Sequence, residues 1–491
     1  MAAAADFEAA IARLEQKDRQ SPEAMNARLE YADFLLQSEN GDCHTRLDAA
    51  QVQLDALASR PAVDVVLPLG PARLADGAYR IHAARATCDP PQRQGELQQA
   101  LEAARKAADF YRDALDYQSA AIMQFNVAAT LHDLGDNEAA IAALEATIAL
   151  DREYGFRDDA QDNVKLLLGW KNQDQSDDSV AQAMRDFPTR TAEFKFGWSD
   201  SDANVAVTAE DISVVHGKVI HSRGVNLLKR QVRQDQRSWA VSYEPGTPTY
   251  AMGDWPRKND DWWFTTYLLT SALLGYPKFG VDHTGDFEKV HDASAFGQSL
   301  SAEITSRIDG AAPGPDERAG ASAAWARTLK AVFMPQYVEE DASQTYNVQT
   351  ATWIGAKLQQ GAWYQMSAPL FLPGLAMGKF LVTHHIDFSY TRQVPCEADA
   401  KDLLCVEIVV HATPDPKDLT LAREQVAHEL RVSPDALRHW SSTSLRLVVK
   451  PDTLVPYVSD TRRYWYSALD GTGKDSTVIL SERIVTASTY H

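Results

Sequence analysis

Hydrophobic residues recur at intervals of three and four along the first third of the chain. This spacing predicts α-helices that each bury one apolar stripe. Turn residues separate the helices, for example Asp89-Pro90-Pro91 and Gly135. Because a helix with a single stripe needs a neighbour to cover it, we expect the helices to pack in pairs as an array. The clearest series are Leu47, Ala50, Leu54 and Leu57, and Leu97, Leu101, Ala104, Ala108 and Tyr111.

The spacing changes beyond residue 190, where apolar residues begin to alternate with polar ones. In residues 380–391, Val382 and Ile386 share one side, and His385 and Asp387 share the other. Alternation of this kind predicts an antiparallel strand with one buried face. Two further runs alternate in the same way: Val406, Ile408 and Val410, and Leu445, Leu447 and Val449.

Turn sequences and helical patterns complete the second part of the chain. Asp282–Asp286 and Asp470–Gly473 contain the residues of hairpin turns. Residues 262–274, 321–333 and 420–430 have helical spacing. We therefore expect an α+β domain with a curved antiparallel sheet and helices on one side.

The length of the chain also requires more than one domain, because 491 residues exceed the roughly 250–300 at which a single core stops growing. The patterns predict a multidomain protein: an all-α helical-repeat domain over residues 1–171, followed by an α+β domain over residues 191–491. Residues 172–190 are polar and acidic and contain a proline near their end. We interpret them as a linker.

One predicted helix pair, Ala121–Asp151, contains a known motif. It resembles the tetratricopeptide repeat family, although Gln124, Thr147 and Arg152 depart from the usual aromatic, alanine and proline. The resemblance covers about 31 residues well and the first third of the chain loosely. It implies a scaffold whose concave face binds a protein or peptide partner, and it brings no catalytic residues. The matching residues are Ala128, Leu131, Gly135, Ala140, Leu144 and Leu150-Asp151.

The charge of the chain narrows the classes of partner. The formal net charge is -20 at pH 7, and acidic residues outnumber basic ones both in residues 1–171 (28 to 17) and in the rest (40 to 31). Such a surface repels phosphate backbones on average, so we expect no nucleic-acid partner. We interpret the local basic cluster of Lys229, Arg230, Arg233 and Arg237 as one solvated face. No run of about 18–20 apolar residues is present, so no membrane span is expected.

The four cysteines are divided equally between the two parts: Cys43 and Cys88 in the first, Cys396 and Cys405 in the second. This distribution favours two disulfides within domains, although four buried free thiols would leave the same pattern. The first residues, Met-Ala-Ala-Ala-Ala-Asp, do not form a signal peptide. The cysteine pairing nevertheless favours a periplasmic or otherwise exported protein, with a cytoplasmic location as the alternative.

Tryptophans concentrate in the second part, where every one except Trp170 is found. Trp255, Trp262 and Trp263 lie next to carboxylates at positions 254, 260 and 261. Aromatic rings beside carboxylates suit sugars, cationic groups or apolar ligands. These three residues are candidates for ligand binding, and ordinary core packing is the alternative interpretation.

His385 and Asp387 complete the ligand-binding candidates. With His384 they come nearest to a metal-ligand cluster, but successive strand residues face opposite sides, so at most two could reach one ion. Asp200–Asn204 lacks the glycine of a calcium loop, and the helix around His428 lacks the second histidine of a zinc protease. We therefore assign no metal and no cofactor.

These observations together predict a non-catalytic, envelope-associated binding or adaptor protein. Its helical repeats would engage a protein or peptide, and its β-rich domain would hold an apolar or sugar-like (glycan) ligand. By pattern alone, the second part resembles the curved-sheet lipoprotein carriers of the bacterial periplasm. The alternative is a hydrolase-type enzyme that uses residues such as His385 and Asp387 in its C-terminal domain, with the repeats recruiting substrate.

Overall fold

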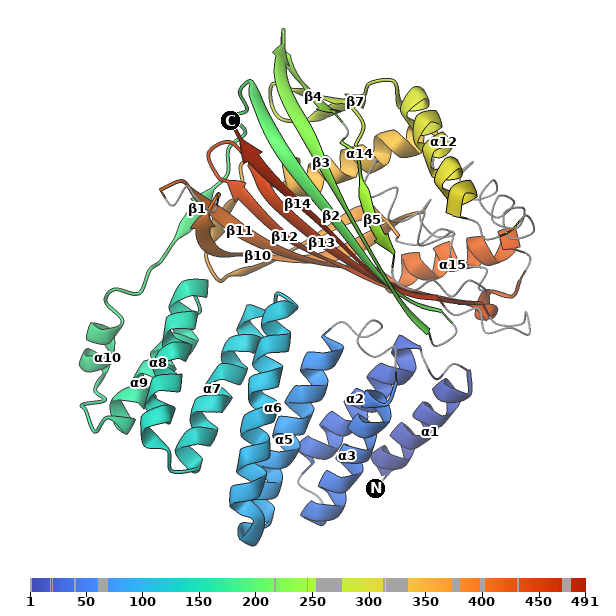
Figure 1. The fold of residues 1–491 in the computed structure, drawn as a ribbon. Coiled ribbons are helices and arrows are strands. Elements are labelled where there is room, and N and C mark those ends of the chain that lie inside the picture. Colours follow the sequence, from blue (N-terminus) through green and yellow to red (C-terminus); the bar gives the residue numbers. More distant parts are fainter. Residues whose placement is uncertain are drawn as a thin grey trace. The chain divides into compact units, whose positions relative to one another are not determined.

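The computed structural model divides the chain into two compact units, Met1–Arg190 and Thr191–His491. It describes the chain apart from residues 1, 18, 20, 39–40, 61–68, 216–217, 245, 253–275, 312–313, 315–333, 373–379, 398–401, 431 and 470–477. The first unit is helical, and the second combines a large antiparallel sheet with helices (Figure 1). The predicted class, an all-α domain followed by an α+β domain, is confirmed.

The first unit is an array in which each helix contacts the next along the chain, as Figure 1 shows. The side chains of the predicted periodic series are largely buried; Leu47, Ala50 and Leu57, for instance, have no exposed surface. The helices are α1 (Ala2–Lys17), α2 (Pro22–Gln37), α3 (Cys43–Ala58), α5 (Gly70–Cys88), α6 (Arg93–Asp113), α7 (Tyr117–Asp133), α8 (Asn137–Tyr154), α9 (Arg157–Trp170) and α10 (Asp177–Ala183), with a 3-10 turn at Pro90–Gln92.

The helix pair predicted from Ala121–Asp151 is present as α7 and α8. Gly135 makes the turn between them with a φ of +83°, a conformation that few residues other than glycine adopt. Asp136 caps α8, since its side chain accepts a hydrogen bond from the Ala139 backbone N–H. Ala128 and Leu144 of the two helices pack in one core.

The predicted linker is more structured than its composition indicates. Its central part forms α10, and Val180, Met184 and Phe187 are buried against residues of α8 and α9. Val180 and the C-cap residue Met184 are four positions apart and therefore lie on one face of α10, and Phe187 follows the turn after the helix. The first compact unit accordingly extends to Arg190.

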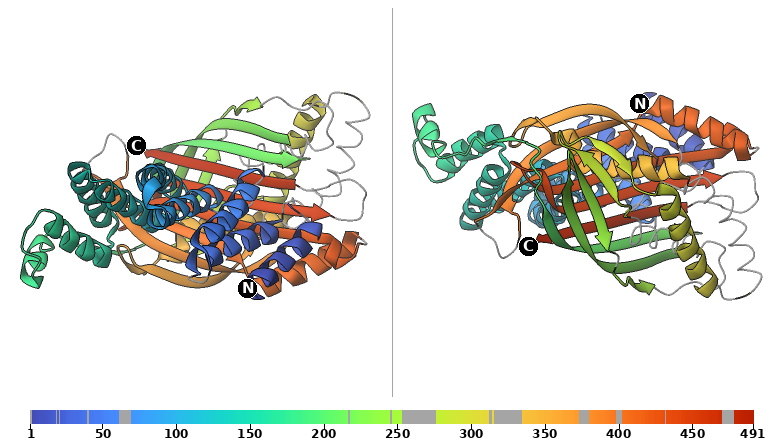
Figure 2. Two further views of the ribbon diagram at one scale, coloured as in Figure 1. Left: turned by 90° about the horizontal axis from the view of Figure 1, so that it is seen from below. Right: turned by 90° about the horizontal axis from the view of Figure 1, so that it is seen from above.

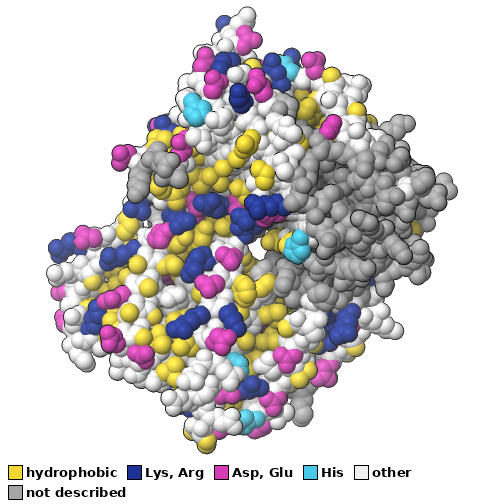
Figure 3. All heavy atoms as spheres, in the orientation of Figure 1, with side chains coloured by type: hydrophobic (Ala, Val, Ile, Leu, Met, Phe, Trp, Pro, Cys, Tyr) yellow, Lys and Arg dark blue, Asp and Glu magenta, His cyan; other side chains and the backbone are white. Residues whose placement is uncertain are grey.

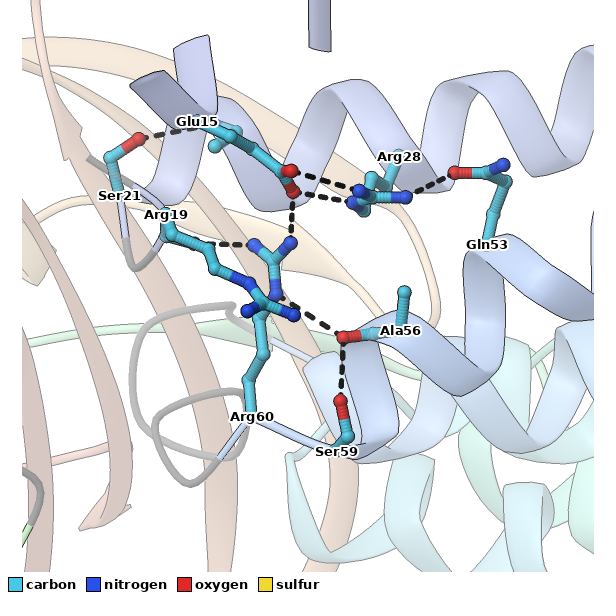
Figure 4. A network of polar contacts seen from close by, with 9 residues as sticks. Glu15, Arg19, Ser21, Arg28, Gln53, Ala56, Ser59 and Arg60 are labelled. Carbon is cyan, nitrogen blue, oxygen red and sulfur yellow. Dashed lines mark hydrogen bonds and ion pairs between the residues drawn. The ribbon is translucent and has the colours of Figure 1, made fainter. Parts of the chain in front are cut away.

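A polar network joins the first three helices (Figure 4). Arg28 donates two hydrogen bonds to the Glu15 carboxylate, of 2.6 and 2.9 Å. Arg60, at the end of α3 and almost completely buried, also pairs with Glu15. These hydrogen bonds, above all those from Arg28, lower the pKa of Glu15 despite its partial burial. A carboxylate held by two guanidinium groups fixes α1 on the rest of the array.

The second unit is built on a 12-stranded antiparallel sheet in the order β7-β6-β4-β3-β2-β14-β13-β12-β11-β10-β9, with β5 paired to β3. Figure 2 shows its curvature. The strands are β2 (Ser201–Val215), β3 (Lys218–Asp235), β4 (Ser238–Glu244), β5 (Thr249–Met252), β6 (Phe279–Asp282), β7 (Phe287–Val290), β9 (Trp363–Phe371), β10 (Leu381–Pro395), β11 (Leu404–Pro414), β12 (Leu437–Lys450), β13 (Val455–Leu469) and β14 (Val478–Tyr490). A separate pair is formed by β1 (Thr191–Glu193) and β8 (Lys357–Gln359).

The alternation predicted for β10, β11 and β12 is confirmed by burial. Ile386, Ile408 and Leu447 belong to one core cluster, together with the other inward residues of these strands. The predicted turn at Asp282–Asp286 joins β6 to β7, whereas Asp470–Gly473 falls outside the described residues.

In the described part of the second unit, three α-helices accompany the sheet: α12 (Ala293–Ala311), α14 (Pro335–Gln349) and α15 (Pro416–Leu430). The last confirms the helix expected over residues 420–430, while those expected over 262–274 and 321–333 lie outside the part of the chain that the structure describes. Val338 and Tyr346 of α14 pack with Val232 and Val241 of the sheet. The Tyr346 hydroxyl also donates a 2.7 Å hydrogen bond to the Gly285 carbonyl, which ties α14 to the β6–β7 turn.

Both predicted cysteine pairs lie at disulfide distance. The Cα atoms of Cys43 and Cys88 are 6.4 Å apart, and this pair links the start of α3 to the end of α5. Those of Cys396 and Cys405 are 4.9 Å apart and close the β10–β11 hairpin. Both separations are within the range for disulfides. Such bonds form and persist in oxidising compartments.

Candidate functional site

One candidate site in the described structure is a cavity between the sheet and helix α14, lined by aromatic, aliphatic and charged side chains. Its volume is about 410 Å³, within the range of roughly 300–1,000 Å³ that is typical of small-molecule sites. The sheet supplies inward residues of β2, β3, β4 and β10–β14, and the helices supply residues of α12 and α14. Aromatic and aliphatic side chains make up most of the wall, including Tyr243, Tyr276, Phe279, Phe296, Leu300 and Trp465.

Strand register explains how this wall forms. Ala203, Val205, Val207 and Ala209 of β2 are buried on one face, because every second residue points to the same side. In the register of the sheet, Tyr490 lies opposite Ala203, Ala203 opposite Arg230, and Arg230 opposite Tyr243. These residues from four strands form a row, and two of them, Arg230 and Tyr243, line the cavity.

Arg230 is the charged member of that row and is only 6% exposed. It reaches past the small side chain of Ala203 and donates a 2.7 Å hydrogen bond from Nη1 to the Tyr490 hydroxyl. The Tyr490 hydroxyl in turn donates to the Pro456 carbonyl at 2.9 Å. The guanidinium lies over the ring of Trp198, with Cζ 5.3 Å from the ring centroid.

A second charged group lines another part of the cavity and is balanced internally. Arg463 lies opposite Glu482 in the sheet, and its Nη1 is 3.5 Å from the Glu482 carboxylate. Asp341 of α14 also lines the cavity, and burial raises its pKa, while Arg463 opposes that rise. Burial raises the pKa of Asp211, which lies beside Glu482 and has no hydrogen-bond partner for either carboxylate oxygen.

A second hollow of about 620 Å³ adjoins this cavity along α14. Asp341, Thr345 and Tyr346 face the first cavity, whereas Glu340 and Asn347 face the second. Leu370, Ile386 and Val410 of the sheet line both.

The predicted ligand residues are distributed differently. Trp255, Trp262 and Trp263 lie outside the described residues. His385 and Asp387 lie on the face of β10 opposite Ile386, which lines the cavity. They are therefore not part of the cavity wall.

His385 and Asp387 have local structural partners on that face. His385 is 56% exposed, and its Nε2 lies 3.0 Å from Asp415, whose carboxylate accepts hydrogen bonds from two backbone N–H groups at the start of α15. Asp387 accepts a 2.8 Å hydrogen bond from Gln365 of the neighbouring strand. In the described part of the chain, no group of three His, Cys, Asp or Glu residues is placed to hold a metal ion.

The interpretation of Lys229, Arg230, Arg233 and Arg237 as one solvated face was wrong for Arg230. In strand β3 the side chains alternate, so Arg230 points into the unit while Lys229 and Arg233 point outward. Arg233 pairs with Asp202 on the outer face.

Figure 3 shows basic and acidic side chains intermixed on the face of the molecule that is drawn in Figure 1. No described helix is long and apolar enough to cross a membrane.

Comparison with known proteins leaves the family open. No family model matches the chain, and no curated protein matches it. A solved structure titled "Lipid-protein interactions in lipovitellin" is similar at 10% sequence identity and a TM-score of 0.27. The match covers 60% of this chain and 25% of that chain. A likeness at this level carries no argument about function.

Proposed function

We propose that the second unit binds an apolar or amphiphilic small molecule in the cavity between the sheet and α14. The observation that carries this proposal is the aromatic and aliphatic lining of a cavity large enough for such a ligand. Burying an apolar ligand there contributes about 25 cal/mol for each Å² of apolar surface removed from water. Binding of a neutral molecule needs no reacting group, so the proposal is that of a carrier or receptor.

Titration with the neutral fluorescent dye Nile red tests the proposal on the full chain. We expect saturable binding with an increase in fluorescence, together with lipid that co-purifies and is detected by mass spectrometry. Thr345→Trp places a large side chain in the cavity, because Thr345 is exposed on the cavity side of α14. This variant should weaken dye binding at least about tenfold.

Asn347→Trp is the matched control, since it adds the same side chain to the same helix on the side of the second hollow. It should leave the dye affinity within about twofold of the original value. Loss of binding in Asn347→Trp but not in Thr345→Trp would move the site to the second hollow. An absence of saturable binding in the unsubstituted protein would refute the carrier proposal.

The helical array would supply a second binding function. We infer from the tetratricopeptide resemblance of α7 and α8 that the array binds a protein or peptide. Cross-linking of the full chain followed by peptide mapping tests this role, and cross-links confined to the second unit would contradict it.

We further infer that the protein resides in the periplasm or another exported compartment, because two disulfides are stable only under oxidising conditions. A thiol titration of denatured, unreduced protein isolated from its native source should detect no free thiol. Four reactive thiols would instead indicate a reducing compartment.

A further inference from the structure

Arg230 is a buried cation of the cavity that has no charge partner among the residues that the structure describes. Among the described residues no carboxylate forms an ion pair with Arg230, although the guanidinium remains protonated at any physiological pH. Taking an isolated charge out of water costs several kcal/mol unless another charge compensates for it. The Trp198 ring and the Tyr490 hydroxyl compensate only in part, since both are neutral.

Two nitrogen donors at this place also lack an acceptor within the described part of the chain. Arg230 Nε and Trp198 Nε1 are both buried, and no described residue accepts a hydrogen bond from them. Both residues line the cavity. Buried donors are rarely left unsatisfied in folded proteins, so this part of the wall has the chemistry of a site for an acceptor with negative charge.

The other arginine of the cavity lacks these properties. Arg463 already faces the carboxylates of Glu482 and Asp341. An acidic ligand would be attracted to Arg230 and repelled by the two carboxylates around Arg463. The distribution of charge along the wall therefore orients a ligand that has one acidic end.

We propose that the cavity takes an amphiphile whose acidic headgroup, a carboxylate or a phosphate, pairs with the Arg230 guanidinium while its apolar tail lies along the aromatic wall. This inference rests on the proposed function of the cavity. It adds that the ligand is an anion of the fatty-acid or alkyl-phosphate type rather than a neutral lipid. Tyr243, Tyr276 and Phe279, which line the cavity together with Arg230, provide the surface for the tail.

Displacement of Nile red from the full chain by four matched competitors tests the inference. Laurate and dodecyl phosphate carry the acid on the same alkyl chain, dodecanol carries the chain without the acid, and inorganic phosphate carries the acid without the chain. We expect at least one of the two acids to bind about tenfold or more tightly than dodecanol, as a charge-assisted pair in a desolvated site implies. Which acid binds more tightly identifies the headgroup, and inorganic phosphate should not compete.

Two substitutions in β3 separate the role of Arg230 from a general effect of charge. Arg230→Gln should reduce the preference for the acid over dodecanol to about twofold or less. Circular dichroism checks that the variant is folded, and both acids and dodecanol are measured on the same variant, so the preference is a ratio that does not depend on its affinity for Nile red. Arg233→Gln removes the same charge from the outer face of the same strand and should keep the preference.

Three results would overturn the inference while the proposed function stands: equal affinity for both acids and dodecanol, a preference that persists in Arg230→Gln, or competition by inorganic phosphate as strong as that by dodecyl phosphate. If Nile red and all alkyl competitors fail to bind the unsubstituted protein, the proposed function fails, and the headgroup assignment fails with it.

Discussion

Asp151 in the helical array is expected to destabilise the protein at neutral pH. Its side chain is completely buried near the end of α8, where Asn163 of α9 donates a 2.8 Å hydrogen bond to Oδ2. No described residue forms a hydrogen bond with the other carboxylate oxygen, Oδ1. Burial, together with the negative charge of Asp159, raises the pKa of Asp151 to about 7, although the bond from Asn163 opposes the rise.

The pKa determines the size and the direction of the effect. Because the folded state holds the proton of Asp151 more tightly than the unfolded state, its contribution to stability is fully present below pH 3.8, falls as the pH rises, and is lost above about pH 7. Each pKa unit corresponds to about 1.4 kcal/mol, so the total loss is about 4 kcal/mol as an upper bound. Asp151→Asn removes the ionisation and keeps an oxygen that can accept the bond from Asn163.

Urea unfolding of the full chain, followed by circular dichroism at 222 nm to report on the helices, measures this effect. At pH 8 we expect Asp151→Asn to be more stable than the original protein by roughly 2–4 kcal/mol, and at pH 4 the two should be nearly equal. Asp162→Asn, an exposed position on α9, is the control and should change stability by less than about 0.5 kcal/mol. An Asp151→Asn variant that is less stable at pH 8, or that keeps the same difference at both pH values, would refute the reasoning.

Three further substitutions test contacts described above. Glu15→Gln leaves the buried Arg60 without its carboxylate and should lower the free energy of unfolding by about 2–3 kcal/mol at pH 7. Because the pKa of Glu15 is lowered in the folded state, the original protein should lose this advantage as the pH falls below the pKa of an ordinary glutamate. An equal difference in stability at pH 3 and pH 7 would contradict the assignment. Replacing Cys43 and Cys88 by serine should lower the free energy of unfolding by about 4 kcal/mol, and replacing Cys396 and Cys405 should lower it by about 2–3 kcal/mol, because the two pairs are 45 and 9 residues apart in the sequence. Thermal melts of the two double variants check that the first is the less stable. Gly285→Ala should lower the free energy of unfolding by roughly 1–3 kcal/mol, because Gly285 has a φ of +96° and a Cβ atom there would collide with neighbouring side chains. An unchanged melting temperature would show that alanine is tolerated in this turn.

Local patterns predicted the elements, because helix and strand periods depend on neighbouring residues. The stripe of α3, the alternation of β10 and the turn at Gly135 are present where expected. Helix α10 was missed because it is short and its surroundings are acidic, so three apolar residues gave too weak a signal.

The cavity could not be predicted in the same way. The surroundings of Arg230 depend on Ala203, Tyr243 and Tyr490, which come together only through the register of four strands. Assigning strand period to residues 229–237 would have placed Arg230 and Arg233 on opposite faces. It would not have shown which face is buried. The acidic average charge of the chain also gives no indication that a single arginine points inward.

The position of α14 has a consequence for how binding can diversify. Since one helix lines both hollows, with Thr345 facing the first and Asn347 facing the second, substitutions at such positions alter the two hollows separately. The scaffold of strands can stay constant while each chamber acquires its own shape. Residues that line both hollows, such as Ile386 and, on α14 itself, Val348, are the exception, because a substitution there alters both at once.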